Sequence, residues 1–265
     1  MAGSTSHSTL NYSTTERVAR ATLARPEQHN SLSEEALDDL GDVVRRVQED
    51  REVRALVLAG DADAFSVGLD DDLLDKAHSD AEYFENVLTR LAAALLSLES
   101  LDVPVVAQVA GKAIGAGFEL ALACDLIVAA EGAELGDCQL AVGTVPGGGA
   151  SIRLPRLIGV QRARELIYSG RTLTGIEAAS IGLVLSAVPA AALEETVAAL
   201  VATLTDKPRA ALASAKRQIN RGLGVDTPSG VEQERRELIR YLQDHEREVV
   251  EGFRARLEGR EPNWA

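Results

Sequence analysis

Residues 104–119 read PVVAQVAGKAIGAGFE, and they open an informative stretch that continues to Pro146. The apolar run 105–110 predicts a strand, and small residues follow it. These small residues predict the start of a helix with one carboxylate, Glu119, in its first turn. A strand that turns into a helix exposes backbone N–H groups at the helix N-terminus, where they can hold an oxyanion. The stretch therefore points to chemistry on a carbonyl group.

Composition excludes several classes of partner. The chain has 265 residues, of which 46% are hydrophobic and 26% charged, as in an ordinary globular protein. Its net charge of −14 disfavours nucleic acid and anionic membranes as partners, and an anionic substrate would need local basic groups. No apolar run approaches the ~20 residues of a membrane span, and no secretion signal is visible.

Cysteine usage predicts a reducing compartment. Cys124 and Cys138 stand among apolar or small residues without a CxxC spacing, and we interpret both as buried thiols. The four histidines match no metal-ligand spacing, so no metal site is predicted. We therefore expect a cytoplasmic protein.

Hydrophobic patterning predicts an α/β chain in three parts. Residues 1–10 are small and polar and are expected to be disordered. Units of strand, strand and helix recur over residues 11–190, and a helical segment follows over 191–265. Within these parts we expect Ser33 to cap a helix, residues 136–140 to form a strand, and residues 231–257 to form one long charged helix.

Five motifs in sequence order resemble those of the crotonase family, the enoyl-CoA hydratase/isomerase superfamily. Each motif alone is weak because Gly and Pro punctuate many loops, but the ordered set over residues 16–190 is highly specific. The motifs are ARP at 24–26 with Asn30, AFSVGLD at 64–70, the stretch 104–119 with ACD at 123–125, GTVPGGG at 143–149 with RLP at 153–155, and GR at 170–171 with Ala178 and GLV at 182–184.

The resemblance implies a fold and a class of substrate. The fold is a crotonase-type spiral of ββα units with a C-terminal helical region used for trimerisation, often as a dimer of trimers that forms a hexamer. The substrate is a thioester carried on coenzyme A, and no metal or redox cofactor is expected.

The resemblance also assigns roles within the site. Leu69 and Ala116 stand where the family places its two oxyanion-hole N–H donors, and Glu119 matches the first of two catalytic glutamates. Preorganised N–H donors suit an enolate oxygen because they require no reorganisation. From the residues alone, Glu119 could instead be an ordinary first-turn carboxylate that the helix dipole stabilises.

Gln139 is the main departure from the family pattern. The second catalytic glutamate falls at this position, where an amide can orient water or a carbonyl but cannot transfer a proton near neutral pH. We nevertheless retain Gln139 as a candidate catalytic residue. A substitute role for the nearby Asp137 depends on the local backbone, because a regular strand would point residues 137 and 139 the same way.

Substrate binding is expected along the 66–70 loop and at the turn before Ala116. Arg25 matches a basic residue near the CoA phosphates in relatives, although it could be an ordinary surface arginine. Asp70-Asp71-Asp72 lacks the lysine that many relatives carry, so a carrier-protein thioester stays open beside CoA. The candidate substrate-binding residues are Arg25, Ser66, Val67, Gly68, Asp70 and Gly115.

These observations predict an acyl-CoA lyase or isomerase that acts through an enolate. The prediction is enoyl-CoA hydratase-like chemistry, as hydration, dehydration or a double-bond shift, with Glu119 as acid and base. One alternative is a decarboxylase or hydrolase of a specialised thioester. Another is a non-catalytic acyl-binding or assembly subunit, which the altered position 139 and the acidic 70–72 loop motivate.

Overall fold

Two sheets run through the core of the chain in the computed structural model, which describes residues 3–6 and 8–264. The larger sheet has the strand order β1-β2-β3-β4-β6-β8-β11, antiparallel over β1 to β3 and parallel from β3 to β11. Its strands are β1 (Gly3–Ser6), β2 (Leu10–Thr15), β3 (Val18–Leu23), β4 (Ala55–Ala59), β6 (Val105–Val109), β8 (Leu126–Ala130) and β11 (Ser186–Val188).

The smaller sheet has the order β10-β9-β7-β5, in which β5, β7 and β9 are parallel. Short strands suffice here because each strand only has to pair beside its neighbour before the chain turns into a helix. The strands are β5 (Ala64–Ser66), β7 (Lys112–Ile114), β9 (Glu134–Gly136) and β10 (Leu173–Thr174).

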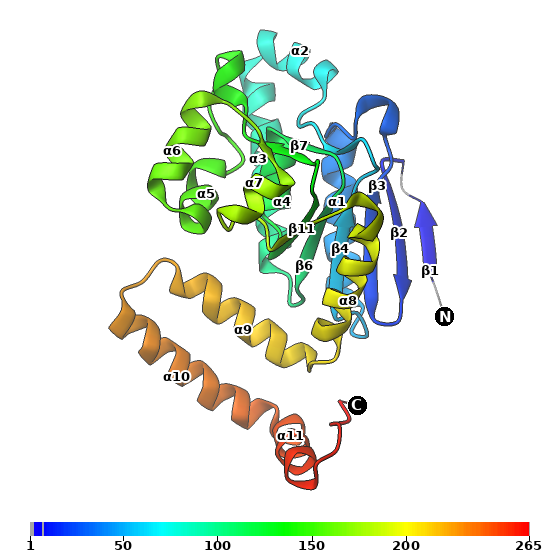
Figure 1. Cartoon of the computed structure of the whole chain (residues 1–265), viewed down its shortest axis with the longest axis vertical. Helices are drawn as coiled ribbons and strands as arrows, with labels where there is room; N and C mark the ends of the chain where they lie inside the picture. Colours follow the sequence, from blue (N-terminus) through cyan, green and yellow to red (C-terminus); the bar gives the residue numbers. More distant parts are fainter. Residues whose placement is uncertain (1–2, 7, 265) are drawn as a thin grey trace.

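Helices cover both sheets and extend beyond them (Figure 1). Ser33 caps the first helix as predicted, since its side chain accepts the N–H of Ala36. The α-helices are α1 (Glu34–Glu49), α2 (Asp71–Ser79), α3 (Ala81–Ser100), α4 (Ala116–Leu122), α5 (Ala150–Ile158), α6 (Val160–Ser169), α7 (Gly175–Ser180), α8 (Leu193–Thr205), α9 (Arg209–Gly222), α10 (Thr227–Asp244) and α11 (Glu246–Glu258), and short 3₁₀ turns are η1 (Pro26–Gln28), η2 (Gln139–Val142) and η3 (Ala190–Ala192).

The chain advances as a spiral in which each turn adds one strand to each sheet. The pairs β4–β5, β6–β7 and β8–β9 each contribute first to the larger and then to the smaller sheet. All residues of β4 and β6 are buried, as expected for parallel strands covered on both faces. This confirms the predicted α/β spiral of ββα units, and it brings the ends of β5, β7 and β9 to one edge.

The N-terminal segment differs from the expectation of disorder over residues 1–10. Residues 3–6 form β1, which pairs antiparallel with β2, and Leu10 is fully buried. Backbone pairing at the sheet edge needs no apolar side chains, so the polar composition did not reveal it. Residues 1–2 and 7 lie outside the described residues.

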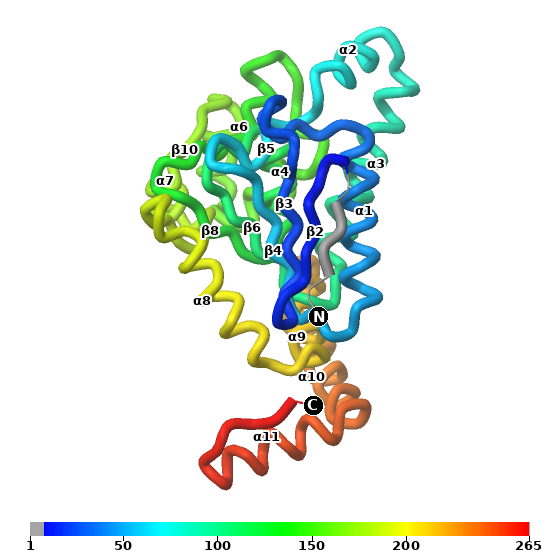
Figure 2. Tube along the Cα trace, turned by 90° about the vertical axis from the view of Figure 1, so that its right-hand side faces the viewer, coloured from blue at the N-terminus to red at the C-terminus, as the bar shows by residue number. Residues whose placement is uncertain are grey.

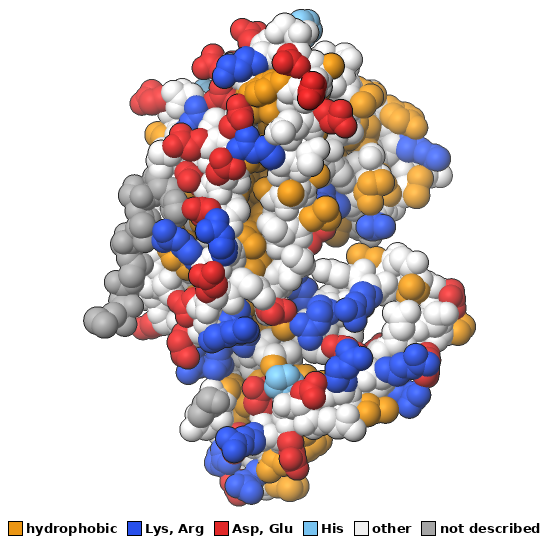
Figure 3. Space-filling view, turned by 180° about the vertical axis from the view of Figure 1, so that it is seen from behind, with side chains coloured by type: hydrophobic (Ala, Val, Ile, Leu, Met, Phe, Trp, Pro, Cys, Tyr) orange, Lys and Arg blue, Asp and Glu red, His pale blue; other side chains and the backbone are white. Residues whose placement is uncertain are grey.

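The C-terminal helices α9, α10 and α11 lie below the sheets in the views of Figures 1 and 2. The predicted single helix over 231–257 is wrong: α10 ends at Asp244 and α11 starts at Glu246, because His245 takes a non-helical conformation between them. Lys216 on α9 fastens this region to the core, since its Nζ lies 2.7 Å from Asp125 Oδ2 and donates to two backbone carbonyls. Seen from behind, Lys and Arg side chains gather over these helices (Figure 3).

Two further expectations concern the burial of the cysteines and membrane-spanning segments. Cys124 is buried as predicted, whereas Cys138 is partly exposed. Within the described ranges, we find no helix with the length and apolar character needed to cross a membrane.

Candidate active site

Three segments meet where the parallel strands of the smaller sheet end. The 66–70 loop follows β5, residues 115–119 follow β7, and residues 137–139 follow β9. Carboxyl ends of parallel strands lie at the same edge of a sheet, so this topology gathers segments that are far apart in sequence. Ten residues were predicted for catalysis, the oxyanion hole and substrate binding, and nine of them lie on these three segments; Arg25 is the exception.

The backbone N–H of Leu69 points away from Leu32, the residue with which Leu69 forms a parallel β-bridge. Leu32 donates to Gly68 O at 2.7 Å and accepts from Asp70 N–H at 3.1 Å. Both bonds are made by the residues on either side of Leu69, so in this parallel bridge the N–H of Leu69 itself points to the opposite side.

The Ala116 N–H lies close to the same loop. Ala116 is the first residue of α4, where a backbone N–H has no acceptor within the helix. A Cβ built on Gly68, whose φ is +104°, would lie 3.2 Å from Ala116 N. One residue on, a Cβ on Gly117 would lie 2.1 Å from Ser66 O, so only glycine lets α4 approach β5 this closely. The two expected donors are therefore on adjoining backbone segments.

Glu119 lies three residues after Ala116 on the same helix and is 1% exposed. Its Oε1 accepts the N–H of Gly148 at 2.8 Å and that of Ala150 at 3.0 Å. Burial raises the pKa of Glu119 above its usual value, and the nearby charge of Asp137 raises it further, while the two N–H groups offset part of the shift. Such a carboxyl group can take up or release a proton near neutral pH more readily than an exposed one.

Gln139 approaches Glu119 from the opposite segment. Its Nε2 donates to Glu119 Oε2 at a long 3.5 Å. The predicted strand over residues 136–140 is wrong: β9 ends at Gly136, Cys138 is left-handed with φ 55°, and Gln139 starts η2. The alternation of a regular strand is thus lost, so residues 137 and 139 need not face the same way. Asp137 is buried with 3% exposure.

A loop that the sequence analysis did not assign to the site holds Glu119 in place. Arg153 donates through Nη1 to Gly148 O at 2.5 Å and through Nε to Glu99 at 2.6 Å. This fixes the Gly148 peptide, whose N–H in turn bonds Glu119. The signal in the sequence was the glycine run 147–149, but nothing in it shows that its N–H groups face a carboxylate 29 residues away.

Arg25 lies outside these segments and is engaged by the 66–70 loop. Its Nη2 is 2.8 Å from Asp70 Oδ2, and its Nη1 donates to Ser31 O at 2.8 Å. Burial raises the pKa of Asp70, but hydrogen bonds from Arg25 and Ser31 outweigh it, and the net shift is downward. The expected contact of Arg25 with CoA phosphates stays a prediction, because this guanidinium already braces the loop that carries Leu69.

The remaining predicted residues support the loop and the turn through backbone hydrogen bonds and through the side chain of Ser66. Ser66 is buried, and its Oγ accepts the N–H of Gly68 at 3.3 Å. Val67 donates its N–H to His29 O at 3.3 Å, and Gly115 donates to Gly136 O at 3.0 Å. These bonds order the loop and the turn, while the predicted contacts of these residues with substrate stay predictions.

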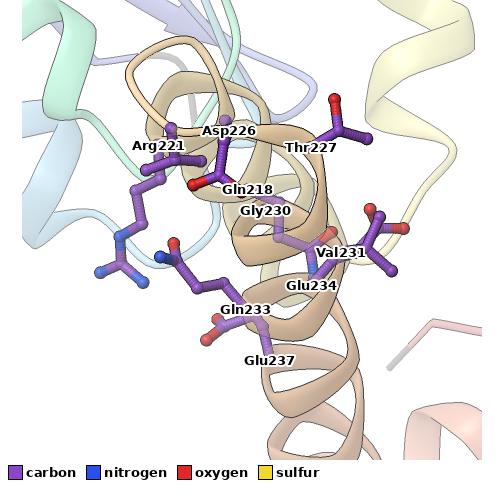
Figure 4. A pocket seen from close by; sticks show the side chains of 11 residues that line it. Gln218, Arg221, Asp226, Thr227, Gly230, Val231, Gln233, Glu234 and Glu237 are labelled. Atoms are coloured by element: carbon purple, nitrogen blue, oxygen red, sulfur yellow. The ribbon is translucent and has the colours of Figure 1, made fainter.

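A hollow of about 270 Å³ lies apart from this site, between α9 and α10. The side chains that line it come from the end of α9, the following loop and the first half of α10 (Figure 4). Its lining contains no residue of the three segments that meet at the sheet edge. We therefore place the candidate active site at Glu119 and not at this hollow.

Comparisons with known proteins agree with this geometry. Residues 13–265 match the family model described as enoyl-CoA hydratase/isomerase. The crystal structure of an enoyl-CoA hydratase from Bacillus anthracis superposes with a TM-score of 0.91 at 34% identity, covering 97% of this chain and 98% of that one. That of an enoyl-CoA hydratase from Mycobacterium smegmatis gives 0.90 at 33% identity, covering 97% and 98%. The "Probable enoyl-CoA hydratase, mitochondrial" of Dictyostelium discoideum is 33% identical over 95% of this chain and 90% of its own length.

Proposed function

This chain belongs to the enoyl-CoA hydratase/isomerase family of lyases and isomerases, the crotonase family, and on that premise we propose that it converts an acyl-CoA thioester through an enolate. The thioester oxygen would bind between the N–H groups of Leu69 and Ala116, and Glu119 would move the proton. Coenzyme A enters as part of the substrate.

One observation carries this proposal: a buried carboxyl group, Glu119, lies in the first turn of α4, and the backbone N–H of Ala116 at the start of that turn has no acceptor within the helix. Ala116 and Glu119 are three residues apart, so both belong to the first turn of the helix. A thioester held by Ala116 N–H therefore has its α and β carbons within reach of the Glu119 side of the site. Each oxyanion donor is typically worth about 3 kcal/mol of transition-state stabilisation.

Gln139 bears on which net reaction follows the enolate. Its amide can hold Glu119 or a water molecule, but it cannot replace a second general acid, whose loss usually costs ~10²–10⁴-fold in rate. We therefore propose proton transfer at the α-carbon as the shared step, with hydration, dehydration or a double-bond shift of a specialised acyl group as the net reaction.

We also propose that the protein works as a trimer or as a hexamer built from two trimers. Apolar side chains of the C-terminal helices are exposed in the single chain, which supports burial against another subunit. They include Val231, Leu238 and Leu242 on α10 and Phe253 and Leu257 on α11. Light scattering after size-exclusion chromatography measures the mass directly, and a monomer at micromolar concentration would contradict the proposal. A cytoplasmic location stays a prediction.

The test of the proposed function is α-hydrogen exchange. A panel of saturated and unsaturated acyl-CoAs, with malonyl-type thioesters included, is incubated in heavy water and read by mass spectrometry. Glu119→Gln keeps the shape of the side chain and an acceptor for the N–H groups of Gly148 and Ala150. We expect exchange in the wild type and a loss of ~10²–10⁴-fold in the variant.

Other outcomes assign the chemistry elsewhere. Exchange that survives Glu119→Gln would remove Glu119 from proton transfer. Carbon dioxide release from malonyl-type thioesters in both proteins would identify a decarboxylase, which needs the oxyanion hole but no base. Binding of thioesters without exchange or conversion would contradict the proposed enolate chemistry.

A further inference from the structure

The loop that binds Glu119 contains three consecutive glycines, Gly147 to Gly149, and glycine has more backbone freedom than any other residue. Gly149 has a φ of +110°, which L side chains rarely adopt. Within this loop, the N–H groups of Gly148 and Ala150 both reach Glu119 Oε1, at 2.8 and 3.0 Å. The conformation that binds Glu119 therefore depends on contacts from outside the glycine run.

Arg153 supplies such a contact from the first turn of α5. Its Nη1 donates to Gly148 O at 2.5 Å. This carbonyl belongs to the peptide between Gly148 and Gly149, which joins the two peptides whose N–H groups bind Glu119. A hydrogen bond at this carbonyl therefore fixes the orientation of the link between both donors.

Residue 149 leaves space for the guanidinium because it is glycine. A Cβ built on Gly149 would lie 2.2 Å from Arg153 Nη1 and 3.1 Å from its Cζ. Glycine at this position thus permits both the left-handed backbone and the close approach of the arginine side chain. The loop and the guanidinium therefore fit together as one packed unit.

Glu99, near the end of α3, binds a second nitrogen of the same guanidinium. Its Oε1 lies 2.6 Å from Arg153 Nε, and the Arg153 side chain is only 12% exposed. The backbone of Glu99 is held in turn, since Asn220 Nδ2 of α9 donates to Glu99 O at 3.3 Å. The donors of a guanidinium lie in one rigid plane, so bonds at Nε and Nη1 together fix its orientation.

We propose that Arg153 is a positioning residue for proton transfer, which holds Glu119 in its productive orientation by fixing the peptide between Gly148 and Gly149, with Glu99 as its anchor. The inference rests on the proposed function of Glu119. Arg153 acts through Glu119 and not by contact with the substrate. Its loss should therefore lower the rate of proton transfer and leave thioester binding unchanged.

Arg153→Met tests this, because it removes both donors and keeps an unbranched side chain. A misplacement of about 1 Å at a reacting group can cost ~10²-fold in rate, and we expect a loss of this size in kcat for α-hydrogen exchange. KM for the same acyl-CoA should stay within about threefold of the wild type. Arg156→Met removes the same charge from an exposed position of α5 and should keep wild-type kcat.

Two conservative variants divide the contact into its parts. Arg153→Lys keeps the charge, but its single nitrogen cannot reproduce the two directed bonds to Glu99 and Gly148 O, so we expect a loss of about tenfold in kcat. Glu99→Gln keeps an oxygen that can accept from Arg153 Nε and removes only the charge. We expect its kcat to lie between those of Arg153→Lys and the wild type.

A double-mutant cycle shows whether Arg153 acts through Glu119. Glu119→Gln removes the group that Arg153 is proposed to position. Adding Arg153→Met to that variant should therefore lower the remaining exchange by less than about threefold. An arginine that only supports the fold would cause the same ~10²-fold loss in both backgrounds.

Amide hydrogen exchange supplies a measurement that needs no substrate. The N–H groups of Gly148 and Ala150 are buried and bound to Glu119, so their hydrogens should exchange slowly in the wild type. In Arg153→Met we expect them to exchange at least about tenfold faster. Mass spectrometry of peptides that cover residues 143–152 measures this, and Arg156→Met should match the wild type.

The outcomes separate this inference from the proposed function. Wild-type kcat in folded Arg153→Met, a raised KM with unchanged kcat, or equal losses in the two backgrounds would overturn the role of Arg153 alone. If Arg153→Met does not fold, wild-type kcat in both Arg153→Lys and Glu99→Gln would overturn it. A wild type that binds thioesters without exchange would overturn the proposed function. In that case, unchanged amide protection in Arg153→Met would still overturn the hold of Arg153 on the loop.

Discussion

Gly148 offers the sharpest test of how the site is built, because its substitution moves one carboxylate. A Cβ built on Gly148 would lie 2.4 Å from Glu119 Oε2 and 3.2 Å from Leu91 Cδ2. Ordinary contact begins near 3.4 Å, so the carboxylate must shift by about 1 Å in Gly148→Ala. A misplacement of about 1 Å at a reacting group can cost ~10²-fold in rate. We expect this loss in kcat.

The neighbouring glycine supplies a matched control. A Cβ on Gly147 would lie 3.4 Å from Leu88 Cδ2, an ordinary contact, so Gly147→Ala should keep wild-type exchange. Overpacking at Gly148 should also destabilise the fold by about 1–3 kcal/mol, measured by urea unfolding. The two variants have the same added methyl group in the same loop. Equal kcat in both folded variants would refute the geometry that places Glu119 against Gly148.

Two further substitutions test the oxyanion donor and the attachment of the C-terminal helices. Ala116→Pro removes the backbone N–H at the first position of α4, where proline is tolerated. We expect a ~10²–10³-fold loss of exchange, with the circular dichroism spectrum retained. Full activity in this variant would show that Ala116 is not an oxyanion-hole donor. Lys216→Met leaves Asp125, whose side chain is 23% exposed, without its partner and removes the donor for two backbone carbonyls, which should cost about 1–3 kcal/mol of unfolding free energy. Lys207→Met, at an exposed pair with Asp206, should cost less than about 1 kcal/mol, and equal losses in the two variants would contradict the role of Lys216 in attaching α9 to the core.

The contact between Arg25 and Asp70 changes how the acidic 70–72 loop is understood. In the sequence alone, the acidic run at 70–72 is unfavourable for binding an anionic carrier, because like charges repel. In the structure, Asp70 is neutralised by Arg25 and also caps α2 by accepting the N–H of Asp72. The acidic residue thus orders the loop that carries Leu69.

Local patterns in the sequence were sufficient for the elements and the family. Buried strands such as β4 and β6 appear as unbroken apolar runs, and Ser33 marks the start of α1 because its side chain caps the helix. Patterns failed where a structure depends on backbone pairing or on a single residue. β1 is polar, and the break at His245 has no proline or glycine to mark it.

The sequence by itself determined the α/β spiral, its family and the choice of Glu119 as a candidate catalytic residue, because these depend on local periodicity and on motifs that are contiguous in the chain. Only the tertiary structure decided what surrounds Glu119. Gly148 and Ala150 reach it from a segment 29 to 31 residues away, and their roles depend on burial and hydrogen bonding. A pKa is set by the atoms around a group in space, and no local pattern records them.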